Sequence, residues 1–201
     1  MNIEAIRAKA YRGIFNQKTY VVSNDNEAII IDAGADLEDV KQSVKSKKVL
    51  GILLTHLHFD HIWYIEDYVK EWDADVYMVQ GAEEKLEKSE LNCSFIIGAD
   101  MTFDIAQKNI KYYAEKLKLG SFDIDVIMTP GHSADSVCLL IEKNLFCGDL
   151  VLGGTIGRTD LYDSSEFDMW QSLDKLKYID FEMAYPGHYE QMTKKEVLRC
   201  F

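Results

Sequence analysis

The stretch Leu53-Leu-Thr-His-Leu-His-Phe-Asp-His-Ile62 places three histidines and one aspartate within six consecutive residues, directly after an apolar run. The chain of 201 residues has five histidines in all, so more than half of them lie in this one segment. Residues 49–54 form a short apolar run, which is typical of a strand buried on both faces. Helical spacing of apolar residues from Ile62 to Trp72 predicts that a helix begins near Asp60 and His61. We therefore expect a strand-to-helix turn in which His56 and His58 share one side and face Asp60 and His61.

This combination of side chains indicates a metal site. Imidazole nitrogens together with a carboxylate suit a borderline divalent ion, with zinc as the expected ion and iron or manganese as alternatives. Neutral histidines packed together without an ion would compete with one another for solvation. A polar turn that contains histidines by coincidence is the poorer explanation.

The remaining histidines follow other predicted strands. Thr129-Pro-Gly-His132 comes after residues 122–128, where apolar and polar residues alternate, and Tyr185-Pro-Gly-His188 comes after the apolar residues 183–185. Leu145-Phe-Cys-Gly-Asp149 ends another strand in a carboxylate. Sites in sheet proteins are usually built just beyond the carboxyl ends of strands. We therefore expect His132, Asp149 and His188 to join the histidine turn.

The rest of the chain predicts an α/β domain. Strands and helices alternate in two successive rounds, which favours central sheets with helices outside in one domain of residues 1–201. Further expected elements are a hairpin of residues 19–23 and 27–32, helices at 37–44, 82–91 and 167–176, a strand at 75–79, a hairpin of 136–141 and 145–147, and a last strand at 183–185. In the helix at 82–91, we expect the charged residues to form a solvated face: Glu83, Glu84, Lys85, Glu87 and Lys88.

Composition narrows the choice of partners. The net charge of −12 disfavours nucleic acid and anionic membranes, so we expect a small-molecule substrate. The four cysteines lack the spacing of a disulfide framework and are expected to be reduced thiols. Residues 1–11 contain Glu4, Arg7 and Lys9, so we expect no signal peptide, no membrane segment and a cytoplasmic protein. The oligomeric state is not indicated.

The chain resembles the metallo-β-lactamase-fold hydrolases in Thr55-His56-Leu-His58-Phe-Asp60-His61, Gly131-His132, Gly148-Asp149 and Gly187-His188. This resemblance implies a four-layer αββα sandwich, with two mixed sheets, outer helices and a two-metal cleft at one edge. It also implies the ligands: His56, His58 and His132 for one metal, Asp60, His61 and His188 for the second, and Asp149 as a bridge.

The resemblance further implies a reaction. Two divalent metals lower the pKa of a bridging water and polarise the scissile carbonyl, and Asp60 is expected to orient the hydroxide and accept its proton. Gly153-Gly-Thr-Ile-Gly-Arg-Thr-Asp160 is similar to the glyoxalase II-like branch, which cleaves thioesters. Since the chain ends 13 residues after His188, we expect a compact member without the helical domain that carries much of the glutathione site.

Five residues near these motifs have two interpretations each. Arg158 can bind a substrate carboxylate or pair with Asp160. Trp63 and Tyr64, where relatives commonly have glycines, can line the cleft for an acyl group or pack into the core. Asp32 is expected to support the ligands or to form a turn, in either case without binding metal. Cys147 shares a strand face with Asp149 and can approach the metals, or it can be a buried free thiol, which is the commoner outcome.

Other functions share parts of this pattern. Persulfide dioxygenases use one iron, for which the corresponding ligands would be His56, His132 and Asp149, and lactonases use the same two-metal motif. A ribonuclease Z-like nuclease is disfavoured by the acidic charge. A flavodiiron-type oxidoreductase is disfavoured because its pattern has glutamate at the position of His58. A purely structural metal protein is disfavoured because a closed structural site needs no residue such as Asp60.

Overall fold

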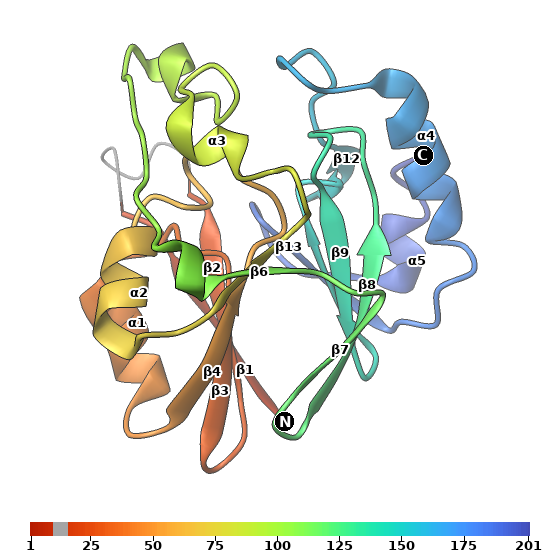
Figure 1. The fold of residues 1–201 in the computed structure, drawn as a ribbon. Coiled ribbons are helices and arrows are strands. Elements are labelled where there is room, and N and C mark those ends of the chain that lie inside the picture. Colours follow the sequence, from red (N-terminus) through yellow and green to blue (C-terminus); the bar gives the residue numbers. More distant parts are fainter. Residues whose placement is uncertain (10–15) are drawn as a thin grey trace.

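Two six-stranded sheets lie face to face in the middle of the computed structural model, which describes residues 1–9 and 16–201 (Figure 1). Helices α1 (Leu37–Val44) and α2 (Ile65–Trp72) cover the outer face of the first sheet. Helices α4 (Glu166–Lys175) and α5 (Lys194–Val197) cover the outer face of the second. The four-layer αββα sandwich expected from the sequence is confirmed.

The first sheet has the strand order β1-β2-β3-β4-β5-β6 and is mixed. Strands β1 to β3 are antiparallel neighbours, whereas β3 to β6 run parallel. The predicted hairpin is β2–β3, and its turn forms because Asn24 Oδ1 accepts hydrogen bonds from the backbone N–H groups of Asn26 and Glu27, both at 2.8 Å. The strands are β1 (Asn2–Arg7), β2 (Lys18–Ser23), β3 (Glu27–Ile31), β4 (Lys48–Leu53), β5 (Val76–Met78) and β6 (Ile110–Tyr112).

The second sheet has the order β14-β13-β10-β9-β8-β7 and is also mixed, because only β10 and β13 run parallel. The predicted hairpin of residues 136–147 corresponds to β9 and β10. The strands are β7 (Lys116–Leu119), β8 (Phe122–Met128), β9 (Val137–Ile141), β10 (Asn144–Gly148), β13 (Met183–Pro186) and β14 (Met192–Thr193). A separate small hairpin consists of β11 (Val151–Leu152) and β12 (Thr155–Ile156).

Apolar side chains fill the space between each pair of layers. In β3, Ala28 and Ile30 face helices α1 and α2, whereas Ile29 and Ile31 face the second sheet. This is the pattern expected for a strand buried on both faces. The side chain of Phe146 in β10 is fully buried between the sheets, where its ring lies 5.4 Å from that of Tyr20 and 5.0 Å from that of Tyr185.

The start of α2 was predicted too early. The helix begins at Ile65, and residues 59–64 form a series of turns. The reason is a competing set of backbone hydrogen bonds: Ala33 N–H donates to His61 O at 2.6 Å, and Tyr64 N–H donates to Ala33 O at 2.8 Å. Tying this segment to residue 33 keeps Asp60 and His61 in a loop rather than in a first helical turn.

Three other predictions need correction. The charged helix is only α3 (Glu84–Glu87), followed by irregular chain with the 3-10 turns η2 (Ser94–Ile97) and η3 (Gln107–Asn109). Lys85 is buried in this helix, so the predicted solvated face is wrong at that residue. Strand β13 is not the last, because β14 pairs with it. In addition, residues 10 and 11 of the N-terminal stretch lie outside the described residues.

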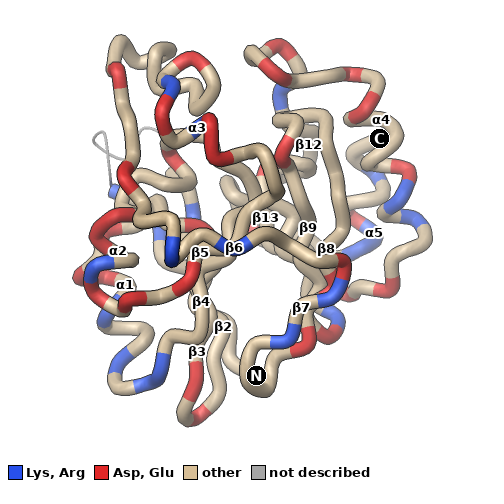
Figure 2. Tube along the Cα trace, in the orientation of Figure 1, with Lys and Arg blue, Asp and Glu red and all other residues tan. Residues whose placement is uncertain are grey.

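Surface charge and the cysteines agree with the composition. Acidic residues are spread along both halves of the chain, with basic residues among them (Figure 2). Cys93, Cys138, Cys147 and Cys200 are free thiols. Across residues 1–9 and 16–201, helices are too short or too polar to cross a bilayer.

The packing between the sheets gives a first prediction. Phe146→Ala should lower the free energy of unfolding by about 3–5 kcal/mol, because it leaves a cavity between two rigid sheets. Phe167→Ala is the matched control: this ring is 75% exposed, so its loss should change stability by less than about 0.5 kcal/mol. Urea unfolding of both variants measures the difference, and equal stabilities would contradict the assigned core.

Candidate metal centre

The sequence-predicted ligands converge from four places in the chain. Four of them lie in the loop between β4 and α2, and the others follow strands of the second sheet. His132 follows β8, Asp149 follows β10 and His188 follows β13. All the ligand-bearing loops leave the carboxyl ends of strands, so the two sheets bring them to one edge of the sandwich. The members are His56, His58, Asp60, His61, His132, Asp149 and His188.

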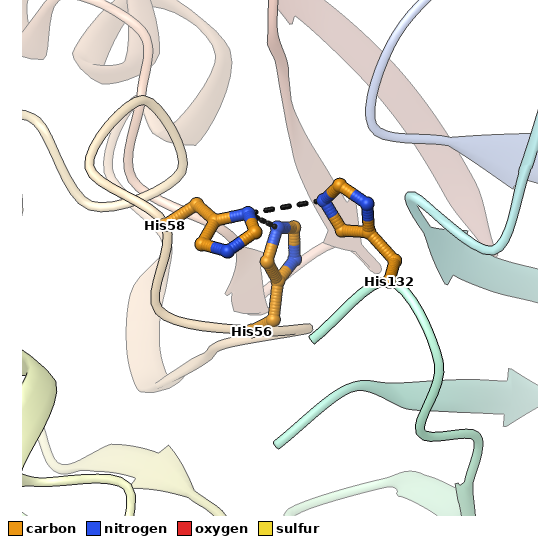
Figure 3. Close-up of side chains that lie close together, drawn as sticks. All are labelled: His56, His58 and His132. Atoms are coloured by element: carbon orange, nitrogen blue, oxygen red, sulfur yellow. Dashed lines mark hydrogen bonds between the residues drawn. The ribbon is translucent and has the colours of Figure 1, made fainter. Parts of the chain in front are cut away.

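Three histidines form a first group. His58 Nδ1 lies 3.1 Å from His56 Nε2 and 3.0 Å from His132 Nε2, so three ring nitrogens point at a common centre (Figure 3). Burial lowers the pKa of His56 and of His58 well below the ordinary value, and neighbouring positive charge lowers both further. These imidazoles are therefore neutral near neutral pH, which is the form that binds metal.

Asp60, His61 and His188 form a second group. Asp60 Oδ2 lies 3.2 Å from His188 Nε2. Burial lowers the pKa of His61, but the carboxylates of Asp32, Asp149 and Asp60 oppose it and raise the pKa well above the ordinary value. This side of the centre therefore favours a positive charge, which a proton or a metal ion supplies.

Asp149 lies between the two groups. Its Oδ2 atom is 3.5 Å from His132 Nε2 in the first group and 3.5 Å from His188 Nε2 in the second. Its Oδ1 atom is 3.4 Å from His61 Nε2. Burial raises the pKa of the Asp149 carboxyl, but His188, His61 and His132 together hold it well below the ordinary value. The carboxylate is therefore ionised and available as a ligand.

The hydrogen bonds around these rings test whether a metal fits. His132 Nδ1 lies 3.0 Å from Arg158 O, and His61 Nδ1 lies 2.8 Å from Asp32 Oδ2; both oxygens only accept, so each Nδ1 carries the hydrogen. In the neutral ring, Nε2 then presents a lone pair to the centre. His61 Nε2 and Asp149 Oδ1 are buried and lack a hydrogen-bond partner within the described part of the chain. Buried acceptors that face one another fit a cation held between them.

Asp32 supports the ligands without belonging to either group, as expected. It directly follows β3 and has φ at +59°, a conformation that aspartate tolerates. Its carboxylate accepts hydrogen bonds from Thr55 N at 2.7 Å and Thr55 Oγ1 at 2.8 Å, besides the contact with His61. Thr55 Oγ1 also lies 3.3 Å from His56 Nδ1. Asp32 thus orients one histidine of each group.

A cavity of about 400 Å³ opens beside the centre. His132, Asp149 and His188 form one wall, and Arg158 lies at the rim, paired with Asp160 through bonds of 2.8 and 3.0 Å. Sequence reasoning missed the other polar residues that line the cavity: Arg7, Asn16, Lys18, Tyr189 and Glu190. The sequence carries no motif at these residues, and the burial of Lys18, the first residue of β2, becomes visible only in the structure.

The structure places the remaining candidates away from this cavity. Trp63 and Tyr64 are partly buried and pack against the core of the first sheet and its helices, and neither lines this cavity, which favours the packing interpretation. Cys147 is buried and its thiol faces Val151 O at 3.9 Å, which makes it a core residue rather than a ligand.

Close packing at Gly187 gives a second prediction. A Cβ atom there would lie 2.4 Å from Asp149 Oδ1 and 2.5 Å from His61 Cε1. Gly187→Ala should therefore displace both ligands and lower the bound metal per chain, measured by elemental analysis, while the protein stays folded.

The control is Gly154→Ala. Gly154 has φ at +102° but open space around its Cα atom, so alanine there strains the backbone without touching the ligands. Full metal content in the Gly187 variant would contradict the described packing.

Comparison with known proteins agrees with this geometry. The Metallo-beta-lactamase superfamily profile matches residues 12–188. A relative named "Probable metallo-hydrolase YqgX" from Bacillus subtilis is 32% identical over 183 residues, or 88% of this chain and 86% of the relative. The hydroxyacylglutathione hydrolase of Buchnera aphidicola is 30% identical over 184 residues, but this chain spans only 60% of that enzyme.

Among solved structures, the BLEG-1 B3 metallo-beta-lactamase superposes with a TM-score of 0.88 at 30% identity, covering 97% of this chain and 95% of that one. The resemblance seen in the histidine motifs is confirmed. The chain belongs to the Metallo-beta-lactamase superfamily, and its likeness to a probable metallo-hydrolase supports a metal-dependent hydrolase.

Proposed function

We propose that the protein uses two divalent metal ions to hydrolyse thioesters or related acyl esters. The observation that carries this proposal is Asp149, whose single carboxylate oxygen Oδ2 lies 3.5 Å from a histidine of each group. A carboxylate within reach of both groups favours two ions that share a ligand. His56, His58 and His132 would hold one ion, and Asp60, His61 and His188 would hold the other.

Zinc is the ion we propose. The donor set consists of imidazoles and carboxylates without a thiolate, which suits zinc and also accommodates iron or manganese. When bound, such a pair of ions makes water a nucleophile near neutral pH and polarises the scissile carbonyl.

Asp60 is the residue we assign to proton transfer. Burial raises the pKa of its carboxyl, but His61 and His188 outweigh burial and hold the pKa below the ordinary value. The carboxylate is therefore ionised at neutral pH. It can orient the attacking water by accepting a hydrogen bond, and it can take up the proton at a carboxylate oxygen.

The cavity supports a substrate that carries an anionic group. The cavity is lined by three basic residues, Arg7, Lys18 and Arg158, whereas the chain as a whole has a net charge of −12. Basic side chains are therefore gathered at this cavity on an otherwise acidic protein, which favours an anionic ligand. Glu190 pairs with Arg7 and, at 3.3 Å, with Lys18, so part of this charge is already balanced. The Arg158 guanidinium holds Asp160 through two bonds, and we propose that it holds a substrate carboxylate in the same way.

The thioester class rests on the likeness to a hydroxyacylglutathione hydrolase, because an acyl-glutathione is a thioester with free carboxylates. Glutathione itself is not part of the proposal, since this chain spans 60% of that enzyme. A lactonase would use the same centre and differ only in substrate. An iron-dependent persulfide dioxygenase would use His56, His132 and Asp149, and would leave the second group without a role.

The third prediction separates these functions. The metal-loaded protein should cleave a carboxylate-bearing thioester without consuming oxygen. His188→Ala should lower kcat/KM by at least about 100-fold, because it removes a ligand of the second ion. Thioester cleavage, lactone cleavage and persulfide-dependent oxygen uptake are measured side by side on both proteins.

Tyr178→Ala, at a side chain that is 82% exposed, is the control and should behave as the parent. Oxygen uptake that survives in His188→Ala, with no thioesterase activity in the parent, would rule out the hydrolase. Lactone cleavage without thioester cleavage would replace the substrate class alone.

A further inference from the structure

Lys85 has a buried ammonium group next to the first group of ligands. Its side chain is 7% exposed, and Nζ lies 2.7 Å from Asp135 Oδ1 and 2.6 Å from Asp163 Oδ2. Nζ also donates to the hydroxyl of Ser133. Its neighbours in sequence, Glu84 and Lys88, instead pair with each other on the surface at 2.9 Å. Lys85 is therefore unlike the rest of its charged segment.

Asp135 connects Lys85 to the histidine turn. While Oδ1 binds the ammonium group, Oδ2 accepts a hydrogen bond from the backbone N–H of Leu57 at 2.9 Å. Leu57 is the residue between His56 and His58. A single carboxylate thus joins Lys85 to the backbone that sets the spacing of two ligands.

Ser133 and Asp163 connect Lys85 to the third histidine. Ser133 follows His132 directly, and Asp163 Oδ2 accepts from the backbone N–H of Ala134 at 3.2 Å. Asp163 lies five residues after Arg158, whose carbonyl oxygen faces His132 Nδ1 at 3.0 Å. Lys85 therefore stands where the loops that carry all three histidines of the first group meet.

The backbone of Lys85 gives a second connection to the same turn. Asn92 Nδ2 donates to Lys85 O at 2.9 Å, and Phe59 N–H donates to Asn92 O at 2.8 Å. The second group depends on other contacts, chiefly the bond from His61 Nδ1 to Asp32. The hydrogen bonds and ion pairs described for the Lys85 side chain reach neither His61 nor His188.

We propose that Lys85 is a positioning residue for the metal ion of the first group. Its ion pairs hold His56, His58 and His132 at the spacing that one ion requires. A buried ion pair is often no more stabilising than well-packed apolar residues would be, so stability alone does not account for this cluster. Groups that orient metal ligands typically change metal affinity by about 10–100-fold when they are removed. The inference rests on the proposed function only in treating this group as a metal site.

The test is a cobalt(II) titration of the metal-free full chain in competition with a chelator. Lys85→Met, which keeps the length of the side chain, should weaken the binding of one of the two ions by about 10–100-fold and leave the other unchanged. The double variant Lys85→Met and His188→Ala identifies the affected ion, because His188→Ala removes a ligand of the second group only. The same loss of affinity in the double variant assigns the effect of Lys85 to the ion of the first group. Lys88→Met, at the residue directly after the same helix, is the matched control and should bind as the parent does.

Hydrogen exchange at the Leu57 amide provides a readout without metal. It should be faster in Lys85→Met than in Lys88→Met, because Asp135 no longer has its counterion in place. If Lys85→Met does not fold, Lys85→Gln replaces it. Because glutamine loses the charge but keeps an N–H donor, the loss of affinity should be smaller and should fall on the same ion, and an unchanged affinity for that ion would overturn the inference.

Unchanged cobalt affinities together with a lower Tm would show that Lys85 is merely structural and would overturn the inference. An equal loss of both ions would also overturn it. If the parent itself binds no cobalt, the proposed function fails. The Lys85 inference is then judged by hydrogen exchange alone, and an unchanged exchange rate of the Leu57 amide in Lys85→Met would refute it.

Discussion

The carboxylate of Asp32 is the contact on which the arrangement of the metal centre depends. It is buried at the end of β3 and accepts hydrogen bonds from the backbone and hydroxyl of Thr55 and from the ring of His61. A buried carboxylate is stable only when hydrogen-bond donors surround it. Asp32 therefore holds Thr55 and His61 in the positions where they donate to it. Through Thr55 it reaches His56, and through its own oxygen it orients His61. One side chain therefore aligns both groups of ligands with the edge of the first sheet.

The two groups differ in their electrostatics, which suits a shared bridging ligand. Burial keeps His56 and His58 neutral, whereas the carboxylates around His61 favour positive charge. Asp149 comes from the second sheet and faces both groups, so the site is complete only when the two sheets are packed together. Glycine at position 187 leaves the room that this convergence requires. Packing between the sheets and metal chemistry are thus linked through a single carboxylate.

The clustering of the candidate ligands could be predicted from sequence because each follows a strand and because imidazole and carboxylate side chains leave few chemical alternatives. The αββα layers followed from the alternation of strands and helices and from the family resemblance. Local sequence patterns gave wrong predictions where residues distant in the sequence determine the burial of a side chain or the start of a helix. Lys85 is in a charged run, but Asp135 and Asp163, 50 and 78 positions away, bury it. Ala33 delays the start of α2, and Lys18 reaches the cavity from a strand without any motif.

The most direct test of this account is anomalous diffraction from crystals of the metal-loaded protein, which locates each ion without reference to activity. We expect two ions per chain, one bound by His56 Nε2, His58 Nδ1 and His132 Nε2, and the other by Asp60, His61 and His188. Asp149 should contact both, with the ions about 3.5–4 Å apart. A single ion bound by His56, His132 and Asp149, with the second group empty at full occupancy of the first, would contradict the two-metal centre.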